Sequence, residues 1–128
     1  MKLNKPLIRK MIKRIETKPL SYDQGAMYAE ESDSAPCGTV ACLAGEAAIC
    51  SKRTEAEGIK FALGRHYDPF ELMGIDSRYA IFNVQGSRWP EPFRTQYRKA
   101  TTRRKQAAVA VDLLKAILRT DGKILEGE

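Results

Sequence analysis

Three cysteines and one histidine are the residues of this 128-residue chain best suited to covalent chemistry. A thiol close to the N-terminus of a helix has a lowered pKa, because the helix dipole stabilises the thiolate. Cys37 and Cys42 lie around the start of a predicted helix, and His66 is the only imidazole that could act as a base for either of them. One hypothesis is therefore a cysteine-dependent hydrolase or transferase that uses Cys37 or Cys42 with His66.

The competing interpretation of the cysteines is structural. Cysteine is a small hydrophobic residue that is often buried, and Cys42 and Cys50 both lie in an apolar run. In an enzyme, Asp68 or Glu46 could orient His66. The three cysteines and His66 could supply four zinc ligands, but their spacing matches no paired zinc-ligand pattern. We therefore expect no metal and no cofactor, and we favour a non-enzymatic protein.

Residues 40–50 form the most apolar stretch of the chain, in which Glu46 is the only charged residue. A helix that is apolar all round has no solvated face, so this stretch predicts a buried central helix. Thr39 is suited to cap it, and Gly38 would let a ligand approach the unpaired backbone N–H groups. Gly38 and Thr39 therefore indicate either a plain helix cap or a site for an anion such as a nucleotide.

Glu46 needs a partner if the helix is buried. A buried carboxyl group is either paired with a cation or has a raised pKa. We expect a structural ion pair with an arginine, for which Arg65 and Arg88 are candidates.

Residues 94–105 hold six cations and no acid. The charge of this one segment, +6, equals the net charge of the whole chain. The cations are Arg94, Arg98, Lys99, Arg103, Arg104 and Lys105. Cations in the first turn of a helix oppose its dipole, so a sequence that keeps them there is predicted to use them. Trp89 and Tyr97 lie close in sequence and are predicted to stack on bases. The segment indicates a surface for nucleic acid, a nucleotide or an acidic protein; the alternative is a solvated basic face.

The remaining patterns predict a mostly α-helical single domain, 1–128, of about five or six helices. Leu7, Ile8, Met11, Ile12 and Ile15 define one face of a first helix that begins at Asn4 and ends before Pro19, with basic residues up to Arg14 on its other face. Asp68, Pro69 and Glu71 predict a helix start, and Gly74 its end. A further short helix is predicted after Asp76, and a last helix from Thr101 or Thr102 to Arg119. A small β-hairpin in residues 20–36 or 83–92 is the alternative to an all-helical chain.

The run from Cys37 to Gly45, C-G-T-V-A-C-L-A-G, resembles the C-G-T-x-x-C-x-A-G motif of an uncharacterised family of small bacterial and phage proteins. Leu72-Met73-Gly74-Ile75 is similar to its L-L-G-L turn, and Ile81-Phe82 with Trp89-Pro90 resembles its "L-F … W-P" segment. The likeness extends over residues 7–124. It implies a shared fold and, by analogy with phage relatives, an accessory or counter-defence role, such as sequestering a nucleotide or blocking a nucleic-acid-binding protein.

The distribution of apolar residues limits the cellular location and the kinds of partner that the sequence predicts. No apolar run reaches the 18 or so residues of a membrane-spanning helix, and no apolar segment of a secretory signal follows the basic N-terminus. We therefore expect a cytoplasmic protein with reduced thiols and no membrane partner. The expected function is a small basic module that binds an anionic partner; the alternatives are the cysteine enzyme and a protein–protein adaptor or inhibitor.

Overall fold

A computed structural model describes residues 2–19, 43–64, 67–76 and 89–126. Within these ranges the chain is helical and has no strand. The α-helices are α1 (Lys5–Thr17), α2 (Leu43–Cys50), α3 (Glu55–Gly64), α4 (Pro69–Met73), α5 (Phe93–Lys99) and α6 (Arg103–Arg119), and a 3₁₀ helix, η3 (Lys123–Glu126), follows. The prediction of a mostly α-helical fold is confirmed. The predicted helix after Asp76 lies outside the described residues, as do residues 20–36 and 83–88 of the two alternative hairpin segments. Residues 89–92 of the second segment are described and contain no strand.

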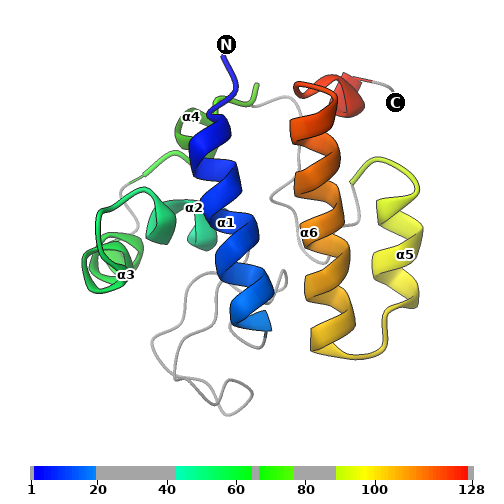
Figure 1. The fold of residues 1–128 in the computed structure, drawn as a ribbon, viewed down its shortest axis with the longest axis horizontal. Helices are drawn as coiled ribbons and strands as arrows, with labels where there is room; N and C mark the ends of the chain where they lie inside the picture. Colours follow the sequence, from blue (N-terminus) through cyan, green and yellow to red (C-terminus); the bar gives the residue numbers. More distant parts are fainter. Residues whose placement is uncertain (1, 20–42, 65–66, 77–88, 127–128) are drawn as a thin grey trace.

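Helices α1 and α6 lie side by side and run in opposite directions (Figure 1). Helix α5 packs on the far side of α6 and is antiparallel to it, while α2 packs against α1 and α3 packs outside α2. The main apolar core lies between α1, α2, α4, α5 and α6. A second, smaller apolar cluster lies between α2 and α3.

Helix α1 begins and ends as its sequence predicts. Asn4 Oδ1 accepts a hydrogen bond from the Leu7 N–H at 3.3 Å, and Pro6 lies in the first turn, where its missing N–H costs nothing. All five predicted apolar residues are buried. The Asn4 N–H and side chain also donate to the carbonyls of Met73 and Leu72, both at 2.8 Å, which fastens the start of α1 to the end of α4.

Helix α4 shows the predicted cap at each end. Asp68 Oδ1 accepts from the N–H groups of Phe70 and Glu71 at 3.0 and 3.4 Å. Gly74 ends the helix in the left-handed conformation, with φ of 71°. A Cβ at Gly74 would lie 2.0 Å from the carbonyl oxygen of Lys2, so the close contact with the start of α1 also requires glycine.

The described part of the predicted central helix is α2, and every one of its eight residues is buried. Residues 40–42 of that prediction lie outside the described residues. Helix α3 approaches α2 at Gly58, where a Cβ would lie 2.0 Å from the carbonyl oxygen of Ile49. The absence of a side chain at this position therefore sets how closely the two helices pack.

Helix α6 carries the longest buried stripe. Its N-cap is Thr102, whose hydroxyl accepts from the Lys105 N–H at 3.1 Å, and it ends at Arg119 as predicted. Helix α5 was not predicted. Glu91 accepts hydrogen bonds from the N–H and the hydroxyl of Thr95 at 3.0 and 2.8 Å and so satisfies one N–H of its first turn. Three aromatic residues four positions apart, Trp89, Phe93 and Tyr97, bury this helix against the core.

Candidate functional site

The predicted basic segment forms one end of the α5–α6 pair, which we call the α5–α6 corner: Arg98, Lys99, Arg103, Arg104 and Lys105. Helix α5 ends and α6 begins at this end of the molecule (Figure 1), so the five cations gather around one turn. Arg98, Lys99, Arg104 and Lys105 are exposed, and none of these four has an ion pair with a residue that the structure describes. Arg94 does not belong to the corner, because it pairs with Glu91 at 3.1 Å.

The prediction that Trp89 and Tyr97 stack on bases is wrong. Trp89 has no exposed surface and Tyr97 is 4% exposed. Their rings pack edge to face, with centroids 5.0 Å apart. Both aromatic side chains therefore stabilise the core under the corner, and their spacing around Phe93 was the sequence signal for this role.

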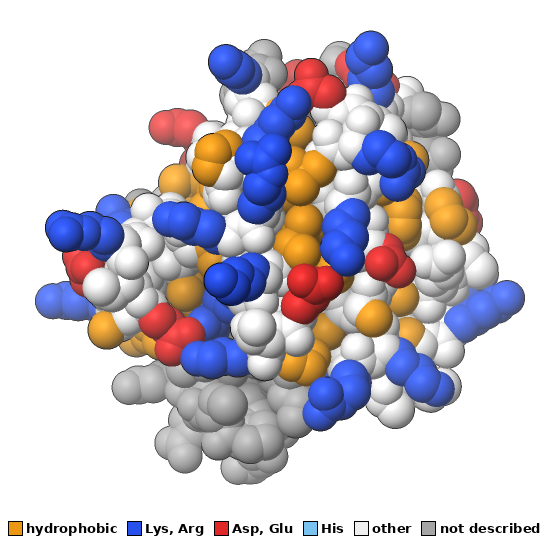
Figure 2. All heavy atoms as spheres, in the orientation of Figure 1, with side chains coloured by type: hydrophobic (Ala, Val, Ile, Leu, Met, Phe, Trp, Pro, Cys, Tyr) orange, Lys and Arg blue, Asp and Glu red, His pale blue; other side chains and the backbone are white. Residues whose placement is uncertain are grey.

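A second group of cations lines a groove between α1 and the turn that joins α2 to α3. We call it the cationic groove, and its volume is about 310 Å3. Among the described residues, its charged lining comprises Lys10, Lys13, Arg14, Lys18, Lys52, Arg53 and one acid, Glu55. Figure 2 shows Lys and Arg side chains spread over this face of the molecule, with Asp and Glu side chains interspersed among them. Sequence analysis missed the groove, because its two sides are about 40 residues apart in the chain.

Behind the groove, Glu46 is fully buried and pairs with Arg14, whose Nε donates to Glu46 Oε2 at 2.7 Å. The expected ion pair is present, but its arginine comes from α1; Arg65 and Arg88 lie outside the described residues. The prediction that Arg14 belongs to the solvated face of α1 is wrong, since its side chain is 9% exposed. Position 14 follows Leu7 by seven residues and Met11 by three, which places it at the edge of the buried face.

The Arg14 guanidinium also donates to Glu55, and Lys18 donates to the same carboxylate at 2.8 Å. The hydrogen bond from Lys18, followed by the charge of Arg14, lowers the pKa of Glu55. Burial raises the pKa of Glu46 to about 7, and the charge of Arg14 only partly offsets that effect. Glu46 Oε1 has no hydrogen-bond partner among the described residues.

Cys50 lies on the floor of the groove and is the one cysteine within the described ranges. Burial, together with the nearby charge of Glu46, raises the pKa of its thiol to about 12. A thiol with this pKa is protonated at neutral pH and is not a nucleophile. Cys37, Cys42 and His66 of the enzyme hypothesis, and Gly38 and Thr39 of the predicted anion site, lie outside the described residues. Both groups proposed to orient His66 are engaged elsewhere, Asp68 as a helix cap and Glu46 with Arg14.

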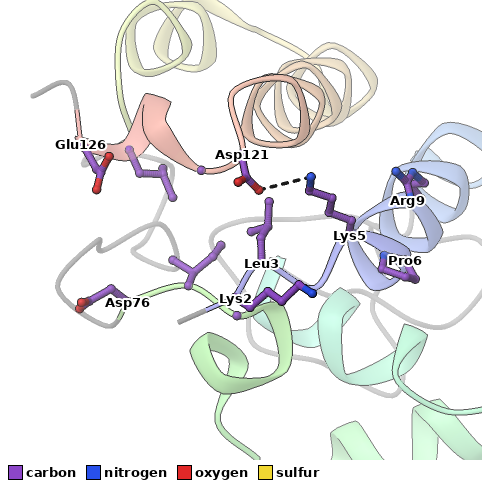
Figure 3. A pocket seen from close by; sticks show the side chains of 12 residues that line it. Lys2, Leu3, Lys5, Pro6, Arg9, Asp76, Asp121 and Glu126 are labelled. Atoms are coloured by element: carbon purple, nitrogen blue, oxygen red, sulfur yellow. Dashed lines mark ion pairs between the residues drawn. The ribbon is translucent and has the colours of Figure 1, made fainter.

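A second hollow, of about 580 Å3, lies between the start of α1, the end of α4 and the turn after α6. Its lining holds both signs of charge, with Lys2, Lys5 and Arg9 facing Asp76, Asp121 and Glu126 (Figure 3). Lys5 and Asp121 form an ion pair at 3.4 Å. This balance gives the hollow no preference for an anion or a cation, in contrast to the groove.

Comparison of the chain with protein-family models, with curated proteins and with solved structures gives no match. The resemblance to the uncharacterised bacterial and phage family therefore stays a prediction. None of the described helices is both long and apolar enough to cross a membrane. Within the described residues, no three or more His, Cys, Asp or Glu side chains are grouped as a metal site.

Proposed function

We propose that this protein is a non-enzymatic binding module that holds the phosphate backbone of nucleic acid at the α5–α6 corner. The observation that carries the proposal is the set of four exposed cations without an ion pair among the described residues: Arg98, Lys99, Arg104 and Lys105. Exposed Lys and Arg side chains that lack acidic neighbours are the groups that neutralise phosphates and release counterions.

The surroundings of the corner favour a phosphate backbone over an acidic protein surface. Protein interfaces draw most of their affinity from a few anchor residues, chiefly Trp, Tyr and Arg, that are packed into fully desolvated pockets. Leu63 of α3 is the one large hydrophobic side chain that is exposed in the described ranges, and it does not belong to the corner. The aromatic rings near the corner are buried, so they supply no platform for unpaired bases. Binding should therefore be independent of sequence and no tighter for single strands than for a duplex.

The proposal is tested by fluorescence anisotropy with a labelled duplex of 20 base pairs, titrated at several salt concentrations. Four phosphate contacts predict a slope of about −3 to −4 in a plot of log K against log salt. The double variant Arg98→Gln/Lys105→Gln should reduce the magnitude of that slope by about 2 and weaken binding.

A matched control carries the same loss of charge at the opposite end of α6. Arg119→Gln/Lys123→Gln removes two exposed cations there, and it should leave the slope within about one half of the wild-type value. Equal losses in the two double variants, or binding that does not respond to salt, would contradict the proposal. A salt-insensitive complex with a protein would support the adaptor alternative.

A further inference from the structure

The cationic groove gathers positive charge that the described residues do not neutralise. Glu55, the one acid among the described residues of its lining, is already engaged by Arg14 and Lys18. Lys10 and Lys13 lie one turn apart on α1, and Lys52 and Arg53 are adjacent in the turn after α2. None of these four cations has an ion pair within the described part of the chain.

The geometry of the groove brings the four cations to one place from two directions. Lys10 and Lys13 project from α1, and Lys52 and Arg53 from the opposite wall, with Ile49 and Cys50 as an apolar floor between them. Lys52 is held in position by the ring of Phe61, whose centroid lies 4.2 Å from its Nζ. An apolar floor lowers the local dielectric constant and so strengthens the attraction of these cations for an anion.

We propose that the cationic groove binds a small molecule that carries two or more linked phosphate groups. Like charges on adjacent turns repel each other in the free protein, and a polyvalent anion between the two walls removes that repulsion. A volume of about 310 Å3 is at the small end of the usual range for ligand sites and fits a compact ligand. The site is separate from the nucleic-acid surface at the corner and does not depend on it.

Isothermal titration of the full-length protein with sodium tripolyphosphate, pyrophosphate and orthophosphate tests the proposal at constant ionic strength. Affinity should fall in that order, because each lost phosphate removes a charge-assisted contact. The groove variant Lys13→Gln/Arg53→Gln should weaken tripolyphosphate binding about tenfold or more, which corresponds to two such contacts.

The variant Arg119→Gln/Lys123→Gln is the matched control, since it removes the same charge at exposed positions outside both the groove and the corner. It should change tripolyphosphate affinity by less than about threefold, with helical content checked by circular dichroism for both variants. Equal weakening by the two variants, or no binding of tripolyphosphate at millimolar concentration, would overturn the proposal. Loss of duplex binding by the groove variant, with duplex binding by Arg98→Gln/Lys105→Gln unaffected, would instead assign the groove to nucleic acid. The protein could fail to bind the duplex while the groove variant alone shows weaker tripolyphosphate binding. In that case only the function proposed for the corner is contradicted.

Discussion

Glu46 has a fully buried carboxyl group with a single donor, the Nε of Arg14, on one of its two oxygens. The free-energy cost of desolvating a buried charge usually exceeds the stabilisation that one ion-pair partner provides. The pKa of Glu46 is therefore raised from 4.5 to about 7. The folded protein therefore binds a proton more readily than the unfolded chain between these two values. Its stability must fall as the pH rises from about 4.5 to 7, and this contribution is constant above that range.

The substitution Glu46→Gln tests this linkage, because glutamine keeps the shape of the side chain and cannot ionise. Relative to the wild type, the variant should become more stable by about 3 kcal/mol as the pH rises from 4.5 to 8. Urea unfolding at a series of pH values measures the difference. Asp112→Asn is the control, because it removes an exposed carboxylate on α6 in place of a buried one. A pH-independent difference between Glu46→Gln and the wild type would show that burial does not govern this carboxyl group.

The partner of Glu46 illustrates what the sequence can and cannot reveal about single residues. The composition of residues 40–50 was enough to predict that Glu46 is buried and paired. The identity of Arg14 was not, because the periodicity of one helix says nothing about which distant helix packs against it. The same limit explains the groove: Lys13 and Arg53 are ordinary surface cations in their own segments and become a site only when α1 packs on α2.

At the scale of the helices, the most reliable predictions of where a helix begins or ends came from capping residues. Asn4, Asp68 and Gly74 each satisfy backbone groups in the manner that their types predict. Helix α5 lacks such a signal, since its N-cap is Pro92 and its first turn depends on the preceding Glu91. Its basic residues suggested a solvated segment, whereas its aromatic residues at every fourth position bury one side of it.

Two glycines in the left-handed conformation give a matched pair of variants for the junction between α1 and α4. Gly74 and Gly122 have φ of 71° and 83°, and alanine costs about 1 kcal/mol at either site from backbone strain. A Cβ at Gly74 would also meet the backbone of Lys2, whereas nothing lies within 4 Å at Gly122. Gly74→Ala should therefore destabilise the protein by about 1–3 kcal/mol more than Gly122→Ala, measured by thermal or urea unfolding. Equal losses would mean that residues 2–4 move away from α4 without cost.

At the scale of the whole molecule, α3 stands apart from the main core. It buries only Gly58 and Ala62, and its main contact is with α2. Regions with few buried apolar contacts open at lower free energy than the global unfolding. Hydrogen exchange followed by mass spectrometry should therefore show faster exchange in α3 than in the middle of α1 and α6. Equal protection across the three helices would place α3 in the same cooperative unit as the core.

Trp89 is the only tryptophan of the chain, and it is sealed in the core against Tyr97, outside the lining of the cationic groove. Its indole fluorescence therefore reports on the folding of the core, because the ring does not contact the charged surface. Emission should shift to longer wavelength when the core opens and stay unchanged when an anion occupies the groove. A change of this emission on adding a ligand would indicate that the interior has rearranged. The protein's own tryptophan therefore distinguishes surface binding from a change of fold without any added label.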